Sequence, residues 1–192
     1  MTAGECLNIY DFDKTIFYPD SSATFYRYCL KTVPSAVFPT LPRSLAAALR
    51  YRRGRLGAKE LKEQLFSFLP AVHDIDALVA AFWLENERRI GSWYLAQKRD
   101  DDLIISASPR FLLAPVCEKL GVSLIATEMD PKTGRITGEN CHDIEKPKRF
   151  FSLYPDAHAE CFYSDSLSDT PMAELAERSF LVKKHKLFPW PK

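Results

Sequence analysis

The chain has 192 residues, with 26 lysines and arginines against 25 aspartates and glutamates, so its formal net charge is +1. This near neutrality gives no overall attraction to nucleic acid or to an acidic surface, and we expect no nucleic-acid partner. Apolar residues make up 46% of the chain and charged residues 27%. Such a composition is typical of a globular protein with one core domain, with or without an inserted segment.

The five cysteines are widely spaced and form no Cys-x-x-Cys pair. This pattern indicates a reducing compartment, without a disulfide framework or a structural zinc site. The first residues show no basic segment followed by an apolar one, and the chain has no apolar run of about 18 residues. We therefore expect a cytoplasmic protein without a membrane-spanning helix.

The first predicted strand, Cys6–Tyr10, leads directly into two carboxylates, Asp11 and Asp13. On an extended backbone this spacing points both side chains the same way. Two like charges so close raise each other's pKa unless a cation lies between them. The pair therefore suits a hard cation, a nucleophilic carboxylate or an acid–base pair, although an Asx turn also explains an isolated Asp-x-Asp.

Residues 16–98 are predicted to be almost entirely helical, which indicates an insert after the first strand. A proline-rich stretch interrupts the pattern after the first of these helices. The predicted helices begin at a cap offered by Asp20-Ser21-Ser22 and continue over Ser44–Tyr51, Ala58–Leu69 and about Ala77 to Gln97. We expect this segment to form a helical domain.

From residue 99 on, short apolar strands alternate with helices, which predicts an α/β fold with a Rossmann-like parallel sheet covered on both faces. Residues 1–15 and 99–192 would form this core domain. Ser108 and Pro109 are predicted to cap the helix that follows them. The predicted strands are Leu103–Ile105, Ser123–Thr127, Ala159–Tyr163 and Phe180–Val182, and the predicted helices end at Leu120 or cover Glu145–Leu153 and Pro171–Arg178.

Polar side chains follow three of the predicted strands, at the sheet edge where ligands of such folds bind. Ser106, at the N-terminus of a helix, can hold a phosphoryl oxygen. Asp165 and Asp169 add carboxylates that would complete an oxygen-rich Mg²⁺ site. Each of these residues alone is also explained as an ordinary turn residue. Their order and their placement at strand ends favour one common site.

Lys146 is the fourth component of the predicted site. Near the start of a helix, its compact cation could neutralise charge that develops on a phosphate. A surface lysine is the alternative interpretation, and Lys148 is a local competitor for the same task.

The order of these motifs resembles the haloacid dehalogenase superfamily of phosphohydrolases. A helical insert between the first and second motifs is where that superfamily carries a C1-type cap, as in the branch that contains phosphoserine phosphatase. The tyrosine-serine-aspartate-serine run and Asn140-Cys141 are closer to phosphatidylglycerophosphatase C. The matching motifs are Asp11-Phe-Asp13-Lys-Thr15, with Lys14 where glycine is common, Ile104-Ile105-Ser106, Lys146, and Tyr163-Ser-Asp165-Ser-Leu-Ser-Asp169.

The resemblance implies a role for each site residue. Asp11 would attack phosphorus to form an aspartyl-phosphate, and Asp13 would act as general acid and then as general base. Mg²⁺ would bind Asp11, the main-chain carbonyl of Asp13 and Asp165. Asp169 would bind the metal through water or orient Lys146. The residues that would hold the phosphoryl group are Ser106, Ala107 and Lys146.

The resulting functional prediction is a Mg²⁺-dependent phosphomonoester hydrolase that acts on a small phosphorylated metabolite. One alternative is a lipid-phosphate phosphatase at a membrane surface, where the basic run containing Arg50 and Arg53 would contact substrate or lipid. A solvated turn between two helices also explains that run. Another alternative is a non-catalytic binder of phosphorylated ligands. Dehalogenation would not need the second aspartate, so Asp13 disfavours it.

Overall fold

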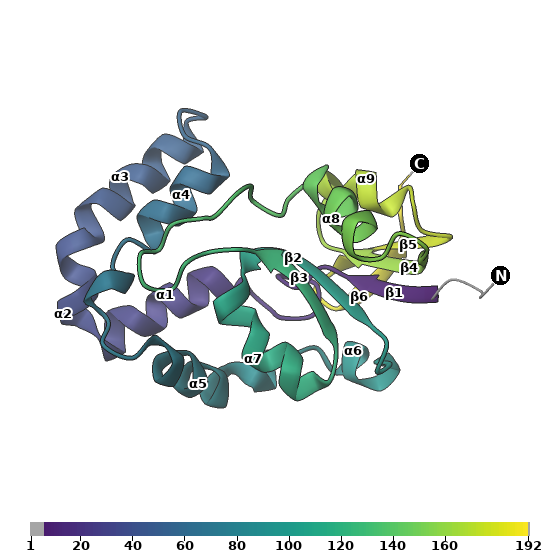
Figure 1. Cartoon of the computed structure of the whole chain (residues 1–192), viewed down its shortest axis with the longest axis horizontal. Coiled ribbons are helices and arrows are strands. Elements are labelled where there is room, and N and C mark those ends of the chain that lie inside the picture. The colour runs from purple at the N-terminus through teal and green to yellow at the C-terminus, as the bar shows by residue number, and fades with distance from the viewer. Residues whose placement is uncertain (1–5, 192) are drawn as a thin grey trace.

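The computed structural model describes residues 6–191, and residues 1–5 and 192 of the predicted core domain lie outside the described residues. Its centre is a six-stranded sheet with the order β3-β2-β1-β4-β5-β6, in which all pairings but the last are parallel (Figure 1). This confirms the predicted α/β fold. The strands are β1 (Cys6–Tyr10), β2 (Leu103–Pro109), β3 (Ser123–Thr127), β4 (His158–Ser164), β5 (Arg178–Lys183) and β6 (Lys186–Pro189).

Helices cover both faces of the sheet, as Figure 1 shows. The helices α6 (Ser92–Gln97) and α7 (Arg110–Leu120) lie on one face, and α8 (Glu145–Leu153) and α9 (Thr170–Ala173) lie on the other. Alternation along β1 serves both faces, because Tyr10 packs into the first apolar cluster and Ile9 into the second. The strands are therefore buried on both sides, which explains their continuous apolar sequence.

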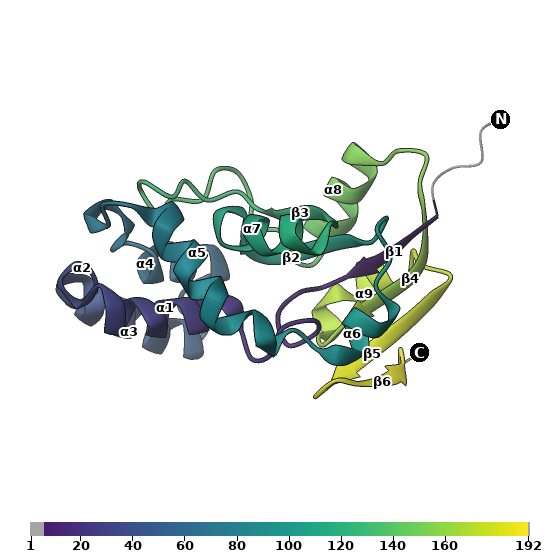
Figure 2. The ribbon, with the colours of Figure 1, turned by 90° about the horizontal axis from the view of Figure 1, so that it is seen from below.

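The segment between β1 and β2 is helical and extends away from the sheet (Figure 2). The prolines here begin helical turns rather than break them, because proline fits the first turn, where no backbone N–H is needed. Its helices are α1 (Ser21–Thr32), α2 (Pro34–Val37), α3 (Leu41–Arg52), α4 (Ala58–Leu65), α5 (Ile75–Asn86) and α6, with 3-10 turns η1 (Phe38–Thr40), η2 (Leu69–Ala71) and η3 (Glu87–Arg89).

The long helix predicted over about Ala77 to Gln97 is wrong, because it is broken between α5 and α6. Ile90 forms an antiparallel bridge with Phe17, and the Gly91 N–H donates to the Ile16 carbonyl. These main-chain bonds hold the chain extended at a position where the side-chain pattern alone still has helical period.

Two features at the C-terminal end also differ from the prediction. The helix predicted over Pro171–Arg178 ends at Ala173, since the Glu177 N–H donates to the Ala159 carbonyl and draws the chain into β5. Strand β6 was not predicted from the sequence. The turn before it places Lys184 and His185 at φ values of 49° and 66°. Such turns are usually recognised by Asn-Gly or Asp-Gly, and neither is present here.

Within residues 6–191, no single helix is both long enough and apolar enough to cross a bilayer. Only Ala58–Ala71 and Ile75–Arg89 taken together reach that length and composition, and they meet at a bend of 114°.

Candidate active site

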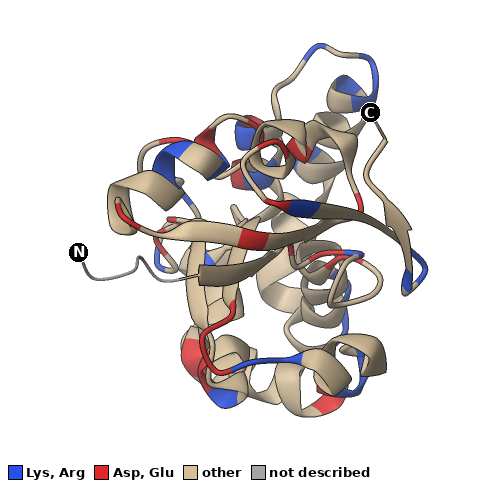
Figure 3. Ribbon diagram, turned by 90° about the vertical axis from the view of Figure 1, so that its right-hand side faces the viewer, with Lys and Arg blue, Asp and Glu red and all other residues tan. Residues whose placement is uncertain are grey.

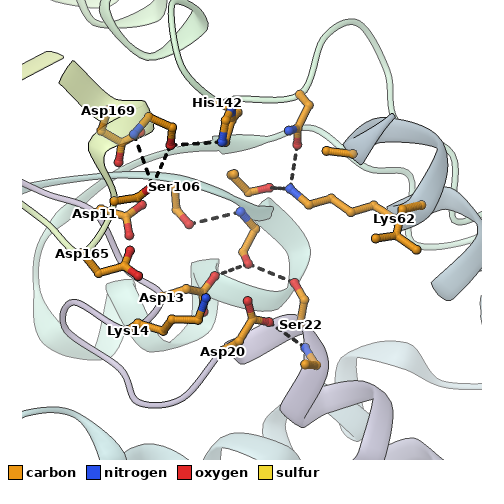
Figure 4. A pocket seen from close by; sticks show the side chains of 18 of the residues that line it. Asp11, Asp13, Lys14, Asp20, Ser22, Lys62, Ser106, His142, Asp165 and Asp169 are labelled. Atoms are coloured by element: carbon orange, nitrogen blue, oxygen red, sulfur yellow. Dashed lines mark hydrogen bonds between the residues drawn. The ribbon is translucent and has the colours of Figure 1, made fainter. Parts of the chain in front are cut away.

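The predicted site residues of the core domain converge at the carboxyl ends of β1, β2 and β4, where they line a cavity of about 460 Å³ (Figure 4). The N-terminus of α8 supplies Lys146 from the sheet side. The helices α1, α3 and α4 close the opposite side. The lining residues from the core are Asp11, Asp13, Lys14, Ser106, Ala107, Ser108, Asn140, His142, Lys146, Asp165, Ser166, Ser168 and Asp169, and those from the helical segment are Asp20, Ser22, Ala23, Tyr51, Ala58, Leu61, Lys62 and Leu65.

Lys146 is the buried cation at the centre of the site. Its Nζ donates to Asp11 Oδ1 at 2.7 Å and to Asp169 Oδ2 at 2.6 Å. Only 2% of its side chain is exposed, against 10% for Asp11 and 3% for Asp169. Asp169 also accepts a hydrogen bond of 2.7 Å from Ser164 Oγ. Two fixed carboxylates therefore hold one ammonium group in place, and the predicted competitor Lys148 pairs with Glu145 at the surface.

Burial and charge pairing have opposite effects on the pKa values of Asp11 and Lys146. Burial raises the pKa of Asp11 to about 7, and the Lys146 ammonium opposes that rise. Burial alone would lower the pKa of Lys146, but Asp11 and Asp169 outweigh it and raise the pKa above that of an ordinary lysine. Lys146 is therefore charged at all physiological pH values. A further cation beside Asp11 would favour its ionised form.

Asp13 lies at the junction of the core and the helical segment. Its carboxylate accepts hydrogen bonds from the Ser21 N–H and from Ser108 Oγ. Burial, and then the nearby charge of Asp20, raise the pKa of Asp13 to about 6. A carboxyl group with this pKa can both give and take a proton near neutral pH.

The predicted helix cap at Ser108 is wrong. The N-cap of α7 is Pro109, which supplies no side-chain bond, and the Ser108 hydroxyl instead donates to Asp13. Ser22 Oγ lies 2.9 Å from the same hydroxyl. The Ser108 N–H donates to Ser106 Oγ at 3.1 Å, which leaves the Ser106 O–H hydrogen directed elsewhere. The shift of register between β2 and β3 takes Ala107 out of the regular ladder.

The Asp165 carboxylate and the main-chain carbonyl of Asp13 supply further oxygen atoms to the site. Within residues 6–191, no other residue donates a hydrogen bond to either, and Asp11 Oδ2 accepts only a long bond of 3.3 Å from Thr15. Burial raises the pKa of Asp165, and Lys14 opposes the rise. In Figure 4 the Asp165 carboxylate points toward Asp11. These free oxygens are the ligands that Mg²⁺ prefers, so the donor set fits this cation.

Side chains alone do not make a complete metal site in the part of the chain that the structure describes, because no three His, Cys, Asp or Glu side chains there cluster closely enough. The fit depends on the Asp13 carbonyl and on two carboxylates. Mg²⁺ commonly keeps several waters and uses only one or two protein carboxylates, so this donor count is sufficient.

Arg50 and Arg53 lie at the end of α3, exposed to solvent, and neither is among the described residues that line the cavity. From that end of α3, Tyr51 reaches the cavity instead. A contact between these arginines and substrate therefore stays a prediction. His142 lines the cavity, and its Nε2 lies 3.3 Å from Ser168 Oγ.

Several residues of the site were not predicted from the sequence. Lys62 of α4 crosses to the core and donates to the Ala107 carbonyl and to Asn140 Oδ1. Ser21 and Ser22 were predicted only as part of a helix cap, although they contact Ser108 and, in the case of Ser21, Asp13. A helix start placed soon after the first motif was a usable signal for these serines. Lys62 lies in an ordinary amphipathic pattern, and no signal marked it.

The chain belongs to the haloacid dehalogenase-like hydrolases, because the family model matches residues 9–174. Protein CicA from two strains of Caulobacter vibrioides is 27% identical over 183 residues, covering 88% of this chain and 82% of CicA. Family membership confirms the predicted superfamily and the prediction that the chain is a hydrolase.

Solved structures show the same fold. A protein with unknown function from Bordetella pertussis Tohama I is 25% identical, with a TM-score of 0.77 over 92% of this chain and 89% of that one. A phospho-aspartyl intermediate analogue of phosphoserine phosphatase is 16% identical, with a TM-score of 0.59 over 92% and 85% of the two chains. The second likeness supports the fold predicted from the phosphoserine phosphatase branch.

Proposed function

We propose that this chain is a Mg²⁺-dependent phosphomonoester hydrolase that acts through an aspartyl-phosphate on a small phosphorylated metabolite. The observation that carries the proposal is the arrangement of Asp11, Lys146 and Asp13 around one cavity. A carboxylate is paired with a fixed ammonium, and a second carboxyl group with a raised pKa lies two residues further on. This combination suits nucleophilic attack followed by proton transfer.

In the first step, an Asp11 carboxylate oxygen attacks phosphorus, and the bond from phosphorus to the ester oxygen breaks. The protonated Asp13 gives its proton to that oxygen, so the leaving group departs as an alcohol. Asp13 then takes a proton from water, and the resulting hydroxide attacks the aspartyl-phosphate. The bond from phosphorus to Asp11 breaks, which releases inorganic phosphate and restores both carboxyl groups.

Other residues would hold the phosphoryl group while this happens. Lys146 places a permanent positive charge beside Asp11, where negative charge develops on the phosphoryl oxygens. The Ser106 hydroxyl, whose hydrogen is not used for the bond from Ser108, can donate to one of those oxygens. Asp169 accepts a hydrogen bond from Lys146, which favours the orienting role over binding the metal through water.

The residues that would hold Mg²⁺ are Asp11, the Asp13 carbonyl and Asp165. When bound, the cation would offset the repulsion between the nucleophile and the phosphate.

We also propose that residues 16–98 act as a cap domain and that the leaving group lies between this cap and the core. The five cysteines are all free, which supports a reducing, cytoplasmic location.

A lipid phosphate is the second candidate substrate. Residues 21–59 contain eight lysines and arginines and no aspartate or glutamate, and Phe38, Leu45 and Leu49 are exposed in that segment. A basic surface with exposed apolar side chains suits an anionic membrane.

The test is a phosphatase screen with p-nitrophenyl phosphate, phosphoserine, other small phosphomonoesters and phosphatidylglycerophosphate in detergent. We expect turnover that depends on Mg²⁺, disappears with EDTA and is absent from Asp11→Asn. The best substrate chooses between the soluble and the lipid candidates. Turnover retained by Asp11→Asn would remove Asp11 as the nucleophile. Mg²⁺ binding without turnover of any ester would favour a non-catalytic phospho-ligand binder.

A further inference from the structure

Lys62 is a buried cation that reaches the cavity from the cap side. It lies on α4, which rests on the core through neighbouring contacts: Lys59 donates to the Gly138 carbonyl, and Glu63 accepts from the Ile136 N–H at 3.0 Å. Lys62 Nζ donates to Asn140 Oδ1 at 2.7 Å and to the Ala107 carbonyl. Figure 4 shows its side chain extending from the helix toward the cavity.

The hydrogen-bond partners of Lys62 differ from those of the other lysines in the cavity. Lys146 is neutralised by two carboxylates, and Lys14 is exposed. Both acceptors of Lys62 are neutral, and an ammonium group has three donors. Within residues 6–191, the third donor has no hydrogen-bond acceptor. The charge is thus buried at a cost that no direct ion pair in the described chain offsets.

The charge on Lys62 is retained at neutral pH. Burial lowers its pKa to about 8, and the charges of Asp13 and Asp20 oppose that fall. A group with this pKa is mostly protonated at pH 7. The cavity therefore presents a positive charge on the side opposite Lys146.

The neighbours of Lys62 show which part of a substrate it faces. Leu61, Leu65 and Tyr51 line the same cap side of the cavity, and none of them can hold a phosphoryl oxygen through a charge. The groups suited to the transferring phosphoryl group lie on the core side, at Ser106 and Lys146. Lys62 is thus placed against the leaving part of an ester.

We infer that Lys62 recognises an anionic group on the leaving part of the substrate, a carboxylate or a second phosphate. The inference rests on the proposed function, and it defines the substrate class as phosphomonoesters that carry an additional negative charge. An anion there would accept the third hydrogen bond of the ammonium and neutralise its charge. Esters with a neutral leaving group would leave Lys62 unpaired.

The experiment measures binding of inert phosphonates in the presence of Mg²⁺, so that it does not depend on turnover. Carboxyalkyl phosphonates and alkylene bisphosphonates with one to three methylenes are compared by calorimetry with alkyl phosphonates of equal length. We expect the best anionic ligand to bind the intact protein roughly 10- to 100-fold more tightly than its neutral counterpart, as expected for a hydrogen bond to a charged group. The two anionic series distinguish carboxylate from phosphate.

Variants then assign the preference to Lys62. Lys62→Met should bring the two affinities within about threefold, Lys62→Arg should keep part of the difference, and Lys59→Met should leave it unchanged. Lys59 is the matched control because it lies on the same helix and contacts the same segment outside the cavity. A circular dichroism melt confirms that each variant is folded.

Two outcomes would overturn the inference. Equal affinities for every matched pair in the intact protein would show that no anion is recognised, and an unchanged preference in Lys62→Met would assign it to another group. Hydrolysis of p-nitrophenyl phosphate is measured in parallel. Its absence would count against the proposed phosphatase activity, whereas the phosphonate affinities would still decide the role of Lys62.

Discussion

Lys146 lies between Asp11 and Asp169, and none of the three side chains is more than 10% exposed. Removing one member of a buried ion pair leaves its partners charged and unpaired, which typically costs about 3–5 kcal/mol. A substitution of Lys146 should also remove the cation that faces the phosphoryl group. Stability and activity are therefore coupled at this residue.

We expect Lys146→Ala to lower kcat at least about 100-fold and to destabilise the fold by about 3–5 kcal/mol. Lys148→Ala is the matched control, because Lys148 lies two residues away on the same helix and pairs with Glu145 at the surface. Its effect on stability should stay within about 1 kcal/mol. Urea denaturation and steady-state kinetics measure both effects. A larger loss of activity in Lys148→Ala would transfer the catalytic role to that residue.

The raised pKa values of Asp11 and Asp13 predict how the metal-free protein responds to pH. A carboxyl group whose pKa is higher in the folded state stabilises the fold below its unfolded pKa, near 4, and loses that contribution as pH rises through its folded pKa. The folded values are about 7 for Asp11 and about 6 for Asp13. Lys146 stays charged throughout this range and adds no pH dependence to it.

The melting temperature in EDTA should therefore fall between pH 4 and pH 7, over and above the contribution of surface groups. Asp11→Asn removes the carboxyl group with the larger of the two rises in pKa and should flatten this fall. Mg²⁺ binds the ionised carboxylates, so its stabilising effect should grow over the same pH range. Thermal melts with and without Mg²⁺ across this pH range measure both the fall in melting temperature and the stabilisation by Mg²⁺. A profile that rises steadily from pH 4 to pH 7 in the metal-free protein would contradict the assignment.

At the scale of elements, an aromatic cluster joins the helical segment to the core. The ring of Phe25 on α1 lies 5.3 Å from Phe82 on α5 and 6.3 Å from both Phe66 and Phe111, the latter on α7 of the core. Phe25 is fully buried. Ser22 and Ala23 of the same helix line the cavity, so the position of α1 and of its serines depends on aromatic packing by residues outside the cavity lining.

Phe25→Ala should destabilise the protein by about 3–5 kcal/mol, because it removes a buried ring and leaves a cavity. Phe38→Ala is the control, since Phe38 is 58% exposed, and it should change stability by less than about 0.5 kcal/mol. Urea unfolding followed by tryptophan fluorescence compares the two. Equal effects would mean that the cluster does not hold α1 against α7.

The elements also show what a sequence can predict. Strands β1, β3 and β4 were predicted nearly to their ends, because residues buried on both faces leave a continuous apolar run. The helix break at Gly91 was not predictable, because main-chain pairing between distant segments causes it. The turn at Lys184 was not predictable either, because its residues have the positive φ values usual for glycine although no glycine is present. Among site residues, the strand ends predicted Asp11 and Asp165. Lys62 was missed because its role depends on how α4 meets the core.

At the scale of the whole molecule, charge is separated along the chain. Eight of the 26 basic residues and none of the 25 acidic residues lie in residues 21–59. Figure 3, which views the molecule from the core side, shows acidic and basic residues interspersed there. In Figures 1 and 2, α2 and α3 lie at the end of the molecule away from the sheet. One end of the molecule is therefore basic, although the net charge of the whole chain is close to zero.

The exposed side chains of this basic end include apolar ones. Leu45 and Leu49, one turn apart on α3, are 58% and 51% exposed, and Phe38 just before them is 58% exposed. Arginines with neighbouring apolar side chains fit the interface of an anionic bilayer, where the charges meet headgroups and the apolar groups enter the acyl boundary. Nucleic acid would use the arginines but would gain nothing from the leucines.

We expect the protein to float with vesicles of phosphatidylcholine containing about 30% phosphatidylglycerol, and to bind vesicles of phosphatidylcholine alone far more weakly. Replacing Arg50, Arg52, Arg53 and Arg55 with glutamine should abolish flotation, and Leu45→Ser with Leu49→Ser should weaken it at high salt, where screening leaves the apolar contribution dominant. Glutamine at Lys183, Lys184 and Lys186 is the control, because it removes similar charge from the β5–β6 hairpin. Loss of flotation in this control would show that net charge, and not the α3 surface, determines binding. If the intact protein does not float, the proposed membrane contact is wrong, and the main support for a lipid substrate is lost with it.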